Sequence, residues 1–542
     1  MRRRQFCLSL LSGLGAGLVP TASGRDPRPA GELLGPSFLT GHKLRGADWP
    51  EPSEQRWIPL LIVGGGIAGL SAAWWLRRSG FEDFRLLELE QQPGGNSRYG
   101  ENRVSAYPWG AHYLPLPGVD LPWVRLLLSD LGVLLGDPVV PEPRYGERHL
   151  CFAPQERLFL HGGWQEGLLP KRGVGRRDLE QYRRFFALME DYRQRRGGDG
   201  KRAFALPMAE SSRDERLLGL DRGSMRDWLL EQGFDSPYLH WYVDYACRDD
   251  FGCASGQTSA WAGLHYFTSR TGGGEDVREG AVLTWPEGNG WIARRLAERL
   301  DARIARRQAV FRVAEIAGGV AVDAFDMESQ QVTRWLAEQV VWAAPSFLLP
   351  HVCGNLPEAL RHAVQGFGYA PWLVANLTLR GFPESRGGAP LAWDNVLHQS
   401  PSLGYVVATH QDWRSREEGT VLTYYRPLSE FTPEAGRKLL LSRNAYDWTE
   451  SILADLSRPH PDIRELAERV DIFRWGHAMA RPSPGSLWHG EREWVAGGFG
   501  RIHPAHSDLS GFSLFEEAQY RGVMAARTAG SRLCGREFGL CL

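Results

Sequence analysis

The fold of this chain is decided by the stretch Leu60-Leu61-Ile62-Val63-Gly64-Gly65-Gly66-Ile67-Ala68-Gly69. It completes the apolar run of residues 57–63, which is typical of a buried parallel strand, and passes directly into a G-x-G-x-x-G turn. Apolar side chains then recur with helical spacing until Gly80, and a second apolar run at 84–87 leads to Glu88. This acid lies 19 residues after Gly69, where it can bond to ribose hydroxyls. The order of these parts predicts a dinucleotide-binding βαβ unit.

Each residue type in the turn has a physical role. Gly64 allows the tight turn, Gly66 lets the backbone approach a pyrophosphate, and Gly69 lets the helix pack closely against the strand. Ile67 and Ala68 open the helix, whose free N–H groups and positive dipole end face the phosphates. The motif alone does not distinguish FAD from NAD.

The residues that follow the acid favour FAD. They include Gln91-Gln92-Pro93-Gly94-Gly95-Asn96-Ser97-Arg98. This segment resembles the E-x(5)-G-G-R stretch of the flavin amine oxidase superfamily, which includes monoamine and polyamine oxidases, protoporphyrinogen oxidase and the phytoene desaturases. The resemblance implies that Gly94 and Gly95 pass close to the diphosphate of FAD. Asn96 stands where the family has arginine, and Arg98, two positions later, is expected to reach the phosphate.

Later segments are similar to the same superfamily in the expected order, at residues 109–112, 286–300, 310–345 and 494–522. The resemblance implies that Gly110 and Ala111 lie near the flavin ring and that a helix begins within the second segment. The third segment predicts a meander of strands, in which the backbone of Val310 would meet the adenine.

The last segment is expected to supply the pyrimidine end of the flavin site. Residues 494–500 resemble a buried strand in which Gly498 replaces an acid of the family and Phe499 follows it. The chain then enters a predicted helix with Leu514, Phe515 and Ala518. The resemblance implies that the N–H groups at the start of this helix point at the flavin pyrimidine and stabilise the negative charge of reduced flavin.

Three residues are candidates for the chemistry. His112 would lie over the flavin and move a proton, or be a hydrogen-bonded buried histidine. Trp475 and His477 belong to Arg474-Trp475-Gly476-His477-Ala478-Met479, which resembles a family segment that places an aromatic residue beside the flavin. Trp475 would form one wall of a substrate slot, excluding water and holding an amine by cation–π contact, or would pack in the core.

Two further features bear on the substrate. The strand expected at residues 369–377 has no lysine, although many amine oxidases of the family carry one there to hold a water at flavin N5, and this weakens a standard amine oxidase assignment. Asp244, Asp249 and Asp250 form an acidic cluster. These acids would bind a cationic substrate if they lie near a pocket, or occupy a capped helix end or solvated face.

The composition excludes several partners. The 63 basic and 64 acidic side chains are nearly balanced, so no nucleic-acid partner is expected. The cysteines have no spacing typical of a metal site, so we expect no metal. An oxidising compartment would allow Cys247–Cys253 or Cys534–Cys541 to form local disulfides.

The N-terminus predicts export. Residues 1–30 contain Arg3-Arg4-Gln5-Phe6, which resembles the twin-arginine pattern, followed by a short apolar stretch. Because twin-arginine export carries folded proteins, it suits a protein that acquires FAD in the cytoplasm. We therefore expect a periplasmic or otherwise exported protein with the twin-arginine machinery as a partner. A linker is expected at residues 31–55, and no stable membrane span apart from an uncleaved signal.

We therefore predict an α/β protein in which an FAD/NAD(P)-binding Rossmann-like domain is interleaved with an α+β substrate domain. The cofactor domain is expected from residues 56–118, 281–350 and 481–542, and the substrate domain from 119–280 and 351–480. FAD is the expected cofactor, and the favoured function is oxidation of a C–N bond in an amine or polyamine-like small molecule. The alternatives are an FAD-dependent desaturase or isomerase of an apolar substrate and a non-catalytic flavin-binding assembly or electron-transfer protein.

Overall fold

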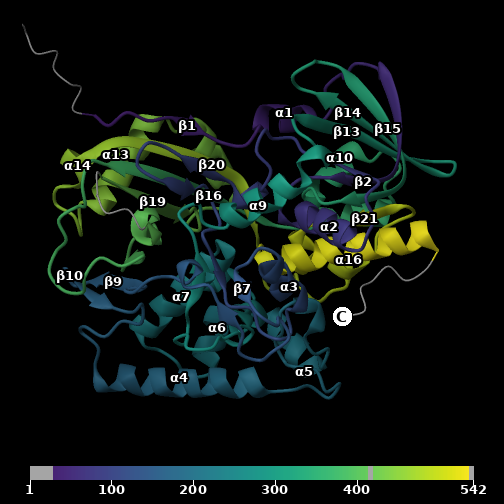
Figure 1. Ribbon diagram of the computed structural model, residues 1–542. Helices are drawn as coiled ribbons and strands as arrows, with labels where there is room; N and C mark the ends of the chain where they lie inside the picture. The colour runs from purple at the N-terminus through teal and green to yellow at the C-terminus, as the bar shows by residue number, and fades with distance from the viewer. Residues whose placement is uncertain (1–27, 413–418, 536–542) are drawn as a thin grey trace, which may run out of the picture.

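The computed structural model of the protein describes residues 28–412 and 419–535. The predicted twin-arginine pattern and Cys541 lie outside the described residues. Two large sheets stand side by side above a layer of helices (Figure 1). Within the described chain, no helix is both long and apolar enough to cross a membrane.

The first sheet contains the predicted βαβ unit. Its strands, in spatial order, are β12 (Ile304–Ala305), β3 (Phe84–Leu87), β2 (Glu54–Val63), β15 (Val332–Trp342), β14 (Gly319–Asp326) and β13 (Gln308–Ile316), with β21 (Ile502–Pro504) also beside β15. β2 runs parallel to both β3 and β15, and its last four residues are buried. β13, β14 and β15 form the predicted antiparallel meander. The predictions of the glycine turn, its helix and the meander are confirmed.

Three helices pack against this sheet: α2 (Ile67–Arg78), α9 (Gly290–Leu300) and α16 (Phe515–Cys534). α2 and α16 approach closely, because a Cβ atom built on Gly522 would lie 2.1 Å from the carbonyl oxygen of Ala68. The buried sides of the helices and the underside of the sheet form one core, which includes Leu60, Ile62 and Val523.

The second sheet draws on distant parts of the chain. Its strands, in spatial order, are β1 (Leu33–Leu34), β20 (Ala467–Ala480), β16 (Tyr369–Leu379), β19 (Thr420–Pro427), β18 (Gly404–Val407), β17 (Asp394–Leu397), β9 (Glu156–Leu160) and β10 (Gly163–Glu166). Short pairs join β4 (Tyr99–Glu101) to β5 (Ala106–Pro108), β6 (Tyr113–Pro115) to β11 (Val282–Thr284), and β7 (Leu134–Leu135) to β8 (Arg144–Tyr145). Because segments of the two sheets alternate along the chain, the predicted interleaved α/β fold class is confirmed.

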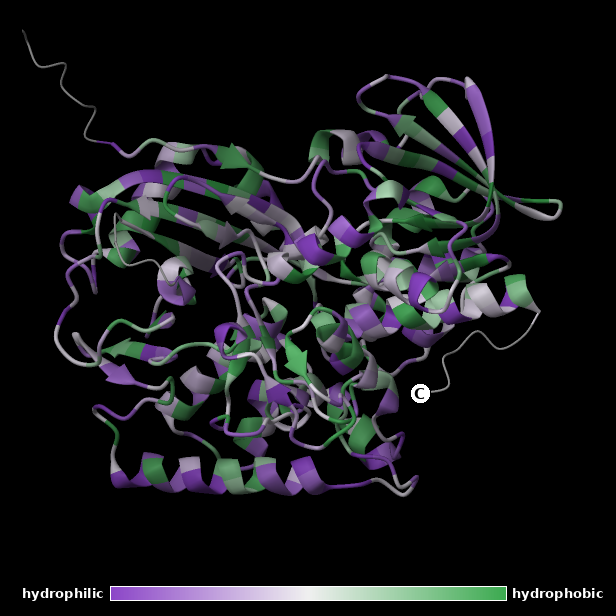
Figure 2. Cartoon of the chain, in the orientation of Figure 1, coloured by the Kyte–Doolittle hydropathy of each residue, from purple (hydrophilic) through white to green (hydrophobic). Residues whose placement is uncertain are grey.

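Helices cover the remaining faces. The lower layer in Figure 1 contains α3 (Pro122–Asp130), α4 (Arg176–Gln194), α5 (Glu215–Leu218), α6 (Met225–Glu231), α7 (Pro237–Phe251) and α8 (Ala260–Thr268). The others are α1 (Phe38–Lys43), α10 (Leu349–Val352), α11 (Glu358–Gln365), α12 (Pro433–Ser442), α13 (Ala445–Leu456), α14 (Ile463–Leu466) and α15 (Glu491–Ala496). Hydrophilic and hydrophobic residues alternate along α4, which buries one face only (Figure 2).

The segment expected as a linker, residues 31–55, makes specific contacts with both sheets. β1 pairs in parallel with β20. Ser37 donates from its backbone N and its hydroxyl to the carboxylate of Glu90, at 2.7 and 3.0 Å. Trp49 stacks on Phe311 of β13 with ring centroids 4.8 Å apart. The segment is therefore a strap that ties the two sheets together, which its Pro- and Gly-rich composition did not indicate.

The prediction of a strand at residues 494–500 is wrong. Glu491–Ala496 forms helix α15, Gly498 and Gly500 adopt positive φ angles in the following turn, and the strand beside β15 is β21. The apolar run Trp494-Val495-Ala496 is too short to distinguish helix from strand by its pattern. The disulfide considered between Cys247 and Cys253 is likewise not formed, because both are free thiols.

Candidate functional site

The glycine turn after β2 is closed by Glu88. One carboxylate oxygen accepts a hydrogen bond from the backbone N of Gly65 at 2.5 Å, and the other accepts one from the backbone N of Glu90 at 2.8 Å. A Cβ atom on Gly69 would lie 1.9 Å from the carbonyl oxygen of Gly64, so no side chain fits there. Burial raises the pKa of Glu88 above its usual range, although the two N–H donors oppose this. The acid therefore fixes the shape of the turn itself.

A second glycine turn faces the first. Gly94 donates from its backbone N to the carbonyl of Gly65 at 2.8 Å. A Cβ atom on Gly95 would lie 3.2 Å from the Cα of Gly66, so the two backbones meet without side chains between them. Gly66 is also the N-cap of α2, and no side chain caps that helix. Bare backbone beside an uncapped helix N-terminus fits the diphosphate of a dinucleotide.

Arg98 makes contacts that the sequence did not indicate, and its predicted contact with the phosphate stays a prediction. Its guanidinium forms an ion pair with Glu90 at 3.0 Å and lies over the rings of Phe473 and Trp475, 5.1 and 5.3 Å from their centroids. The side chain is buried. Arg98 therefore joins the turn to β20, and through Glu90 it also meets Ser37 of the N-terminal strap.

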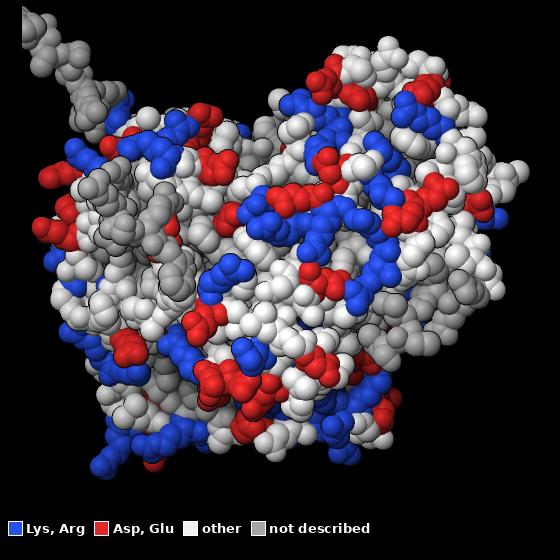
Figure 3. Space-filling view, viewed as in Figure 1, with Lys and Arg blue, Asp and Glu red and all other residues white. Residues whose placement is uncertain are grey.

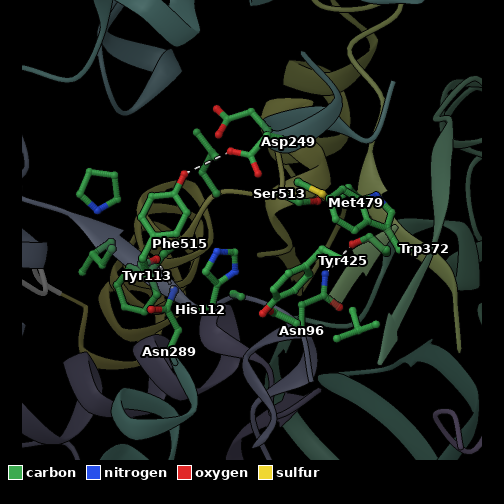
Figure 4. A pocket seen from close by; sticks show the side chains of 18 of the residues that line it. Asn96, His112, Tyr113, Asp249, Asn289, Trp372, Tyr425, Met479, Ser513 and Phe515 are labelled. Atoms are coloured by element: carbon green, nitrogen blue, oxygen red, sulfur yellow. Dashed lines mark hydrogen bonds between the residues drawn. The ribbon is translucent and has the colours of Figure 1, made fainter. Parts of the chain in front are cut away.

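A cavity of about 140 Å³ opens between β16, β19 and β20 of the second sheet, the end of α7 and the start of α16 (Figure 4). Several predicted site residues line it: Asn96, Gly110, Ala111, His112, Trp475, Leu514 and Phe515. The structure thus brings together three segments that are far apart in the sequence.

Aromatic rings form the walls of the cavity. His112 stacks on Tyr425 with centroids 4.5 Å apart, and the hydroxyl of Tyr425 donates to the carbonyl of Gly110 at 2.9 Å. Trp475 donates from its indole N to the carbonyl of Trp109 at 2.6 Å. Burial lowers the pKa of His112 to about 4, so its imidazole is neutral at neutral pH.

Two buried polar atoms at the cavity have no protein partner. Asn289 and Trp372 both line it and are 2% and 7% exposed, yet the side-chain oxygen of Asn289 and the indole N of Trp372 make no hydrogen bond among the described residues. Buried polar groups are nearly always paired in native proteins. Neither atom is accessible from the cavity, so both lie behind its wall and do not face a bound ring. Trp372 lies on β16, the strand in which many amine oxidases of the superfamily carry a lysine and this chain has none.

Carboxylates occupy part of the cavity lining. Asp250 pairs with Arg270 through two hydrogen bonds of 2.9 and 2.8 Å. Asp249, its neighbour on α7, accepts a hydrogen bond from the hydroxyl of Tyr113 at 3.4 Å. Burial, with the charge of Asp250 adding to it, raises the pKa of Asp249 to about 7. Burial also raises the pKa of Glu516, in the first turn of α16, to about 7.

Other predicted site residues do not line the cavity. His477 stacks on Phe347, 4.5 Å between centroids, and lies outside it. Val310 lies in β13, Gly498 and Phe499 lie in the turn before β21, and Ala518 packs into the core beneath α2. Cofactor contacts by these residues stay predictions. The described residues also hold no group of His, Cys, Asp or Glu that could bind a metal ion.

Sequence reasoning missed several lining residues. Tyr113 directly follows the segment at 109–112, so its position was a usable signal. The sequence around Tyr425 contains no such signal, because Tyr425 reaches the cavity only through the pairing of β19 with β16. Arg270 and Glu516 were missed for the same reason, since each is placed by long-range packing.

Comparisons with known proteins agree with this architecture. Residues 62–131 match the family model of an NAD(P)-binding Rossmann-like domain. Putrescine oxidase, solved with putrescine bound, superposes with a TM-score of 0.63 at 17% identity, covering 89% of this chain and 100% of that one. The chain shares its fold.

Two other solved structures share this fold. Cyclohexylamine oxidase from Brevibacterium oxydans IH-35A has a TM-score of 0.63 at 13% identity and covers 88% of this chain and 99% of its own. A CLA-producing fatty acid isomerase from P. acnes has a TM-score of 0.57 at 14% identity, covering 87% and 98%. A search of the curated proteins finds no significant match.

Proposed function

We propose that the protein is an exported FAD-dependent oxidoreductase that oxidises a C–N bond in an amine or polyamine-like small molecule. The observation that carries this proposal is the cavity that holds His112, Trp475 and the carboxylate of Asp249 together with predicted FAD contacts. Its aromatic walls suit an alkyl amine, and its carboxylate suits a cation. The fold shared with putrescine oxidase and cyclohexylamine oxidase supports the proposal.

The residues that would hold FAD form two groups. The glycine turns around Gly66 and Gly95 would receive the diphosphate, and Asn96, Gly110, Ala111 and Leu514 would surround the ring. When bound, FAD supplies the acceptor for a hydride and its two electrons.

The chain's own residues prepare the substrate. Trp372, Trp475 and Tyr425 exclude water and present ring faces to an amine. His112 was a candidate for proton transfer, but a group with a pKa of about 4 is a weak proton acceptor at neutral pH. Its stacking on Tyr425 makes it a positioning residue for the substrate chain.

An absorbance spectrum of the purified protein tests the proposal, recorded before and after anaerobic addition of monoamines and polyamines. Flavin bands that an amine bleaches are the expected result. Protein without flavin would refute the cofactor assignment, whereas flavin that no amine bleaches would favour the desaturase or non-catalytic alternatives. Export through the twin-arginine pathway is tested separately, by the location of the protein after replacement of Arg3 and Arg4 by lysine.

The desaturase or isomerase alternative has one supporting observation, the fold shared with the fatty acid isomerase. The cavity opposes it, because Asp249, Asp250 and Glu516 line the space that an apolar chain would occupy. Burying an apolar chain there would desolvate the carboxyl groups of Asp249 and Glu516 further, whereas Asp250 keeps its two bonds to Arg270.

A further inference from the structure

We propose that Ser37, in the N-terminal strap, is a positioning residue for Trp475, because it holds this aromatic wall of the cavity in place through Glu90 and Arg98. The strap then belongs to the substrate site, although it precedes the nucleotide-binding unit in the sequence and none of its residues 31–55 lines the cavity. The part of this inference that concerns substrate binding rests on the proposed function. The position of the Trp475 ring is measured without it.

The first route from the strap to the cavity runs through side chains. Glu90 accepts hydrogen bonds from the backbone N and the hydroxyl of Ser37, at 2.7 and 3.0 Å, and pairs with Arg98 at 3.0 Å. The guanidinium of Arg98 lies 5.3 Å from the centroid of the Trp475 ring. Arg98 makes no other ion pair or side-chain hydrogen bond among the described residues, so the position of Glu90 decides where this guanidinium lies.

The second route runs along the backbone. β1 pairs with β20 so that Leu34 lies opposite Phe473, and the carbonyl of Leu34 accepts a hydrogen bond from Arg474 Nε at 3.2 Å. Phe473 and Arg474 directly precede Trp475. Figure 1 shows β1 along β20, and α1, which begins one residue after Ser37, between the two sheets. The same short segment of the strap therefore contacts both the neighbours of Trp475 and the carboxylate that orients Arg98.

Arg98 also reaches Trp475 through its main chain. The indole N of Trp475 donates to the carbonyl of Trp109 at 2.6 Å, and the backbone N of Trp109 donates to the carbonyl of Arg98 at 3.0 Å. Arg98 thus holds Trp475 in two ways, by its guanidinium on the ring and by its carbonyl through Trp109. A displacement of Arg98 disturbs both contacts.

The charged pair in this connection lies inside the protein. The side chains of Glu90 and Arg98 are 18% and 9% exposed. On the face of the molecule shown in Figure 3, acidic and basic side chains are interspersed in contact with water, and such surface pairs are weak. A partly buried pair is screened much less, and loss of the groups that satisfy it has a larger effect. Glu90 is therefore sensitive to loss of its two Ser37 donors.

A graded series of variants at Ser37 tests the proposal. Ser37→Thr keeps both donors, and Ser37→Ala removes the hydroxyl. Ser37→Pro removes both donors, and the φ of −65° at this position is the value that proline requires. Ser53→Ala is the matched control, because Ser53 is also a serine of the strap but its hydroxyl bonds to Gln331 and Val332, and none of these residues lines the cavity.

Hydroxyl-radical footprinting with peptide mapping measures the exposure of the Trp475 ring in the purified protein, with the fully buried Trp261 of α8 as internal standard. We expect the ratio of Trp475 to Trp261 labelling to rise about twofold in Ser37→Ala and about fivefold in Ser37→Pro, because a hydrogen bond to a charged group is lost at each step. Ser37→Thr and Ser53→Ala should keep the wild-type ratio. A wild-type ratio in Ser37→Pro would overturn the proposal, and if that variant does not fold, a wild-type ratio in Ser37→Ala would overturn it.

Steady-state kinetics separate positioning from a purely structural role. With hexylamine, or another amine that bleaches the flavin, we expect KM to rise about threefold in Ser37→Ala and about tenfold in Ser37→Pro with kcat changed less than about twofold, because a displaced wall weakens binding without touching the reacting groups. Lower stability with an unchanged KM would show that the strap only ties the sheets together, and would overturn the role in substrate binding. Flavin that no amine reduces would refute the proposed function instead, and the labelling ratio would still decide whether Ser37 positions Trp475.

Discussion

Replacement of Gly522 by alanine tests how the cofactor site is supported. The added Cβ would lie 2.1 Å from the carbonyl oxygen of Ala68 and 2.9 Å from its carbon. Non-bonded heavy atoms rest about 3.5 Å apart, so α16 and α2 would have to separate by more than about 1 Å. The obstruction is backbone, which cannot rotate away as a side chain can.

The magnitude follows from two opposing effects. Overpacking of this kind costs about 1–3 kcal/mol, and the backbone contact places Gly522→Ala at the upper end. Alanine in a helix interior returns about 1 kcal/mol relative to glycine. We therefore expect a net loss of about 2 kcal/mol in the free energy of unfolding. Because the first turn of α16 lines the cavity through Phe515 and Glu516, we also expect weaker retention of FAD.

Urea unfolding followed by circular dichroism measures the stability, and flavin fluorescence in the filtrate measures cofactor release. Thr528→Ala is the matched control, because Thr528 lies on the same helix but is exposed, so alanine there should be neutral or slightly stabilising. Gly522→Ala with wild-type stability and wild-type FAD retention would refute the close approach of the two helices.

Two further predictions concern the frame of the site. Burial would raise the pKa of Asp508, but His506 and the hydrogen bonds from Ser346 lower it to about 2. Because this folded-state pKa is below the unfolded value of about 4, the ionised carboxylate stabilises the fold above pH about 4. This stabilisation is lost as the pH falls towards 2. We expect Asp508→Asn to cost about 2 kcal/mol in urea unfolding at pH 7 and progressively less below pH about 4; a cost independent of pH would contradict this. The substitution Trp49→Ala removes the ring that stacks on Phe311 and should lower the free energy of unfolding by about 1–2 kcal/mol in the same assay. A decrease of less than about 0.5 kcal/mol would show that the strap does not hold the sheets together.

Local patterns were sufficient for the nucleotide-binding part of the fold. The apolar run before Gly64, the helix from Ile67 and the acid at Glu88 lie in one stretch, and each follows from backbone geometry or burial. Where the local signal was short, prediction failed, as at the helix Glu491–Ala496. The strap at residues 31–55 was missed because its partners in β20 lie more than 400 residues away.

The sequence by itself therefore determined the βαβ unit, the interleaved fold class and several of the residues that line the cavity. The environment of each carboxylate was decided only by the tertiary structure. Asp249 and Asp250 are adjacent in the sequence, yet Asp250 takes two hydrogen bonds from Arg270 whereas Asp249 takes one from the hydroxyl of Tyr113. The physical reason is that charge compensation depends on which distant segments converge, and side chains 20 residues apart or more meet only after the sheets and helices have packed.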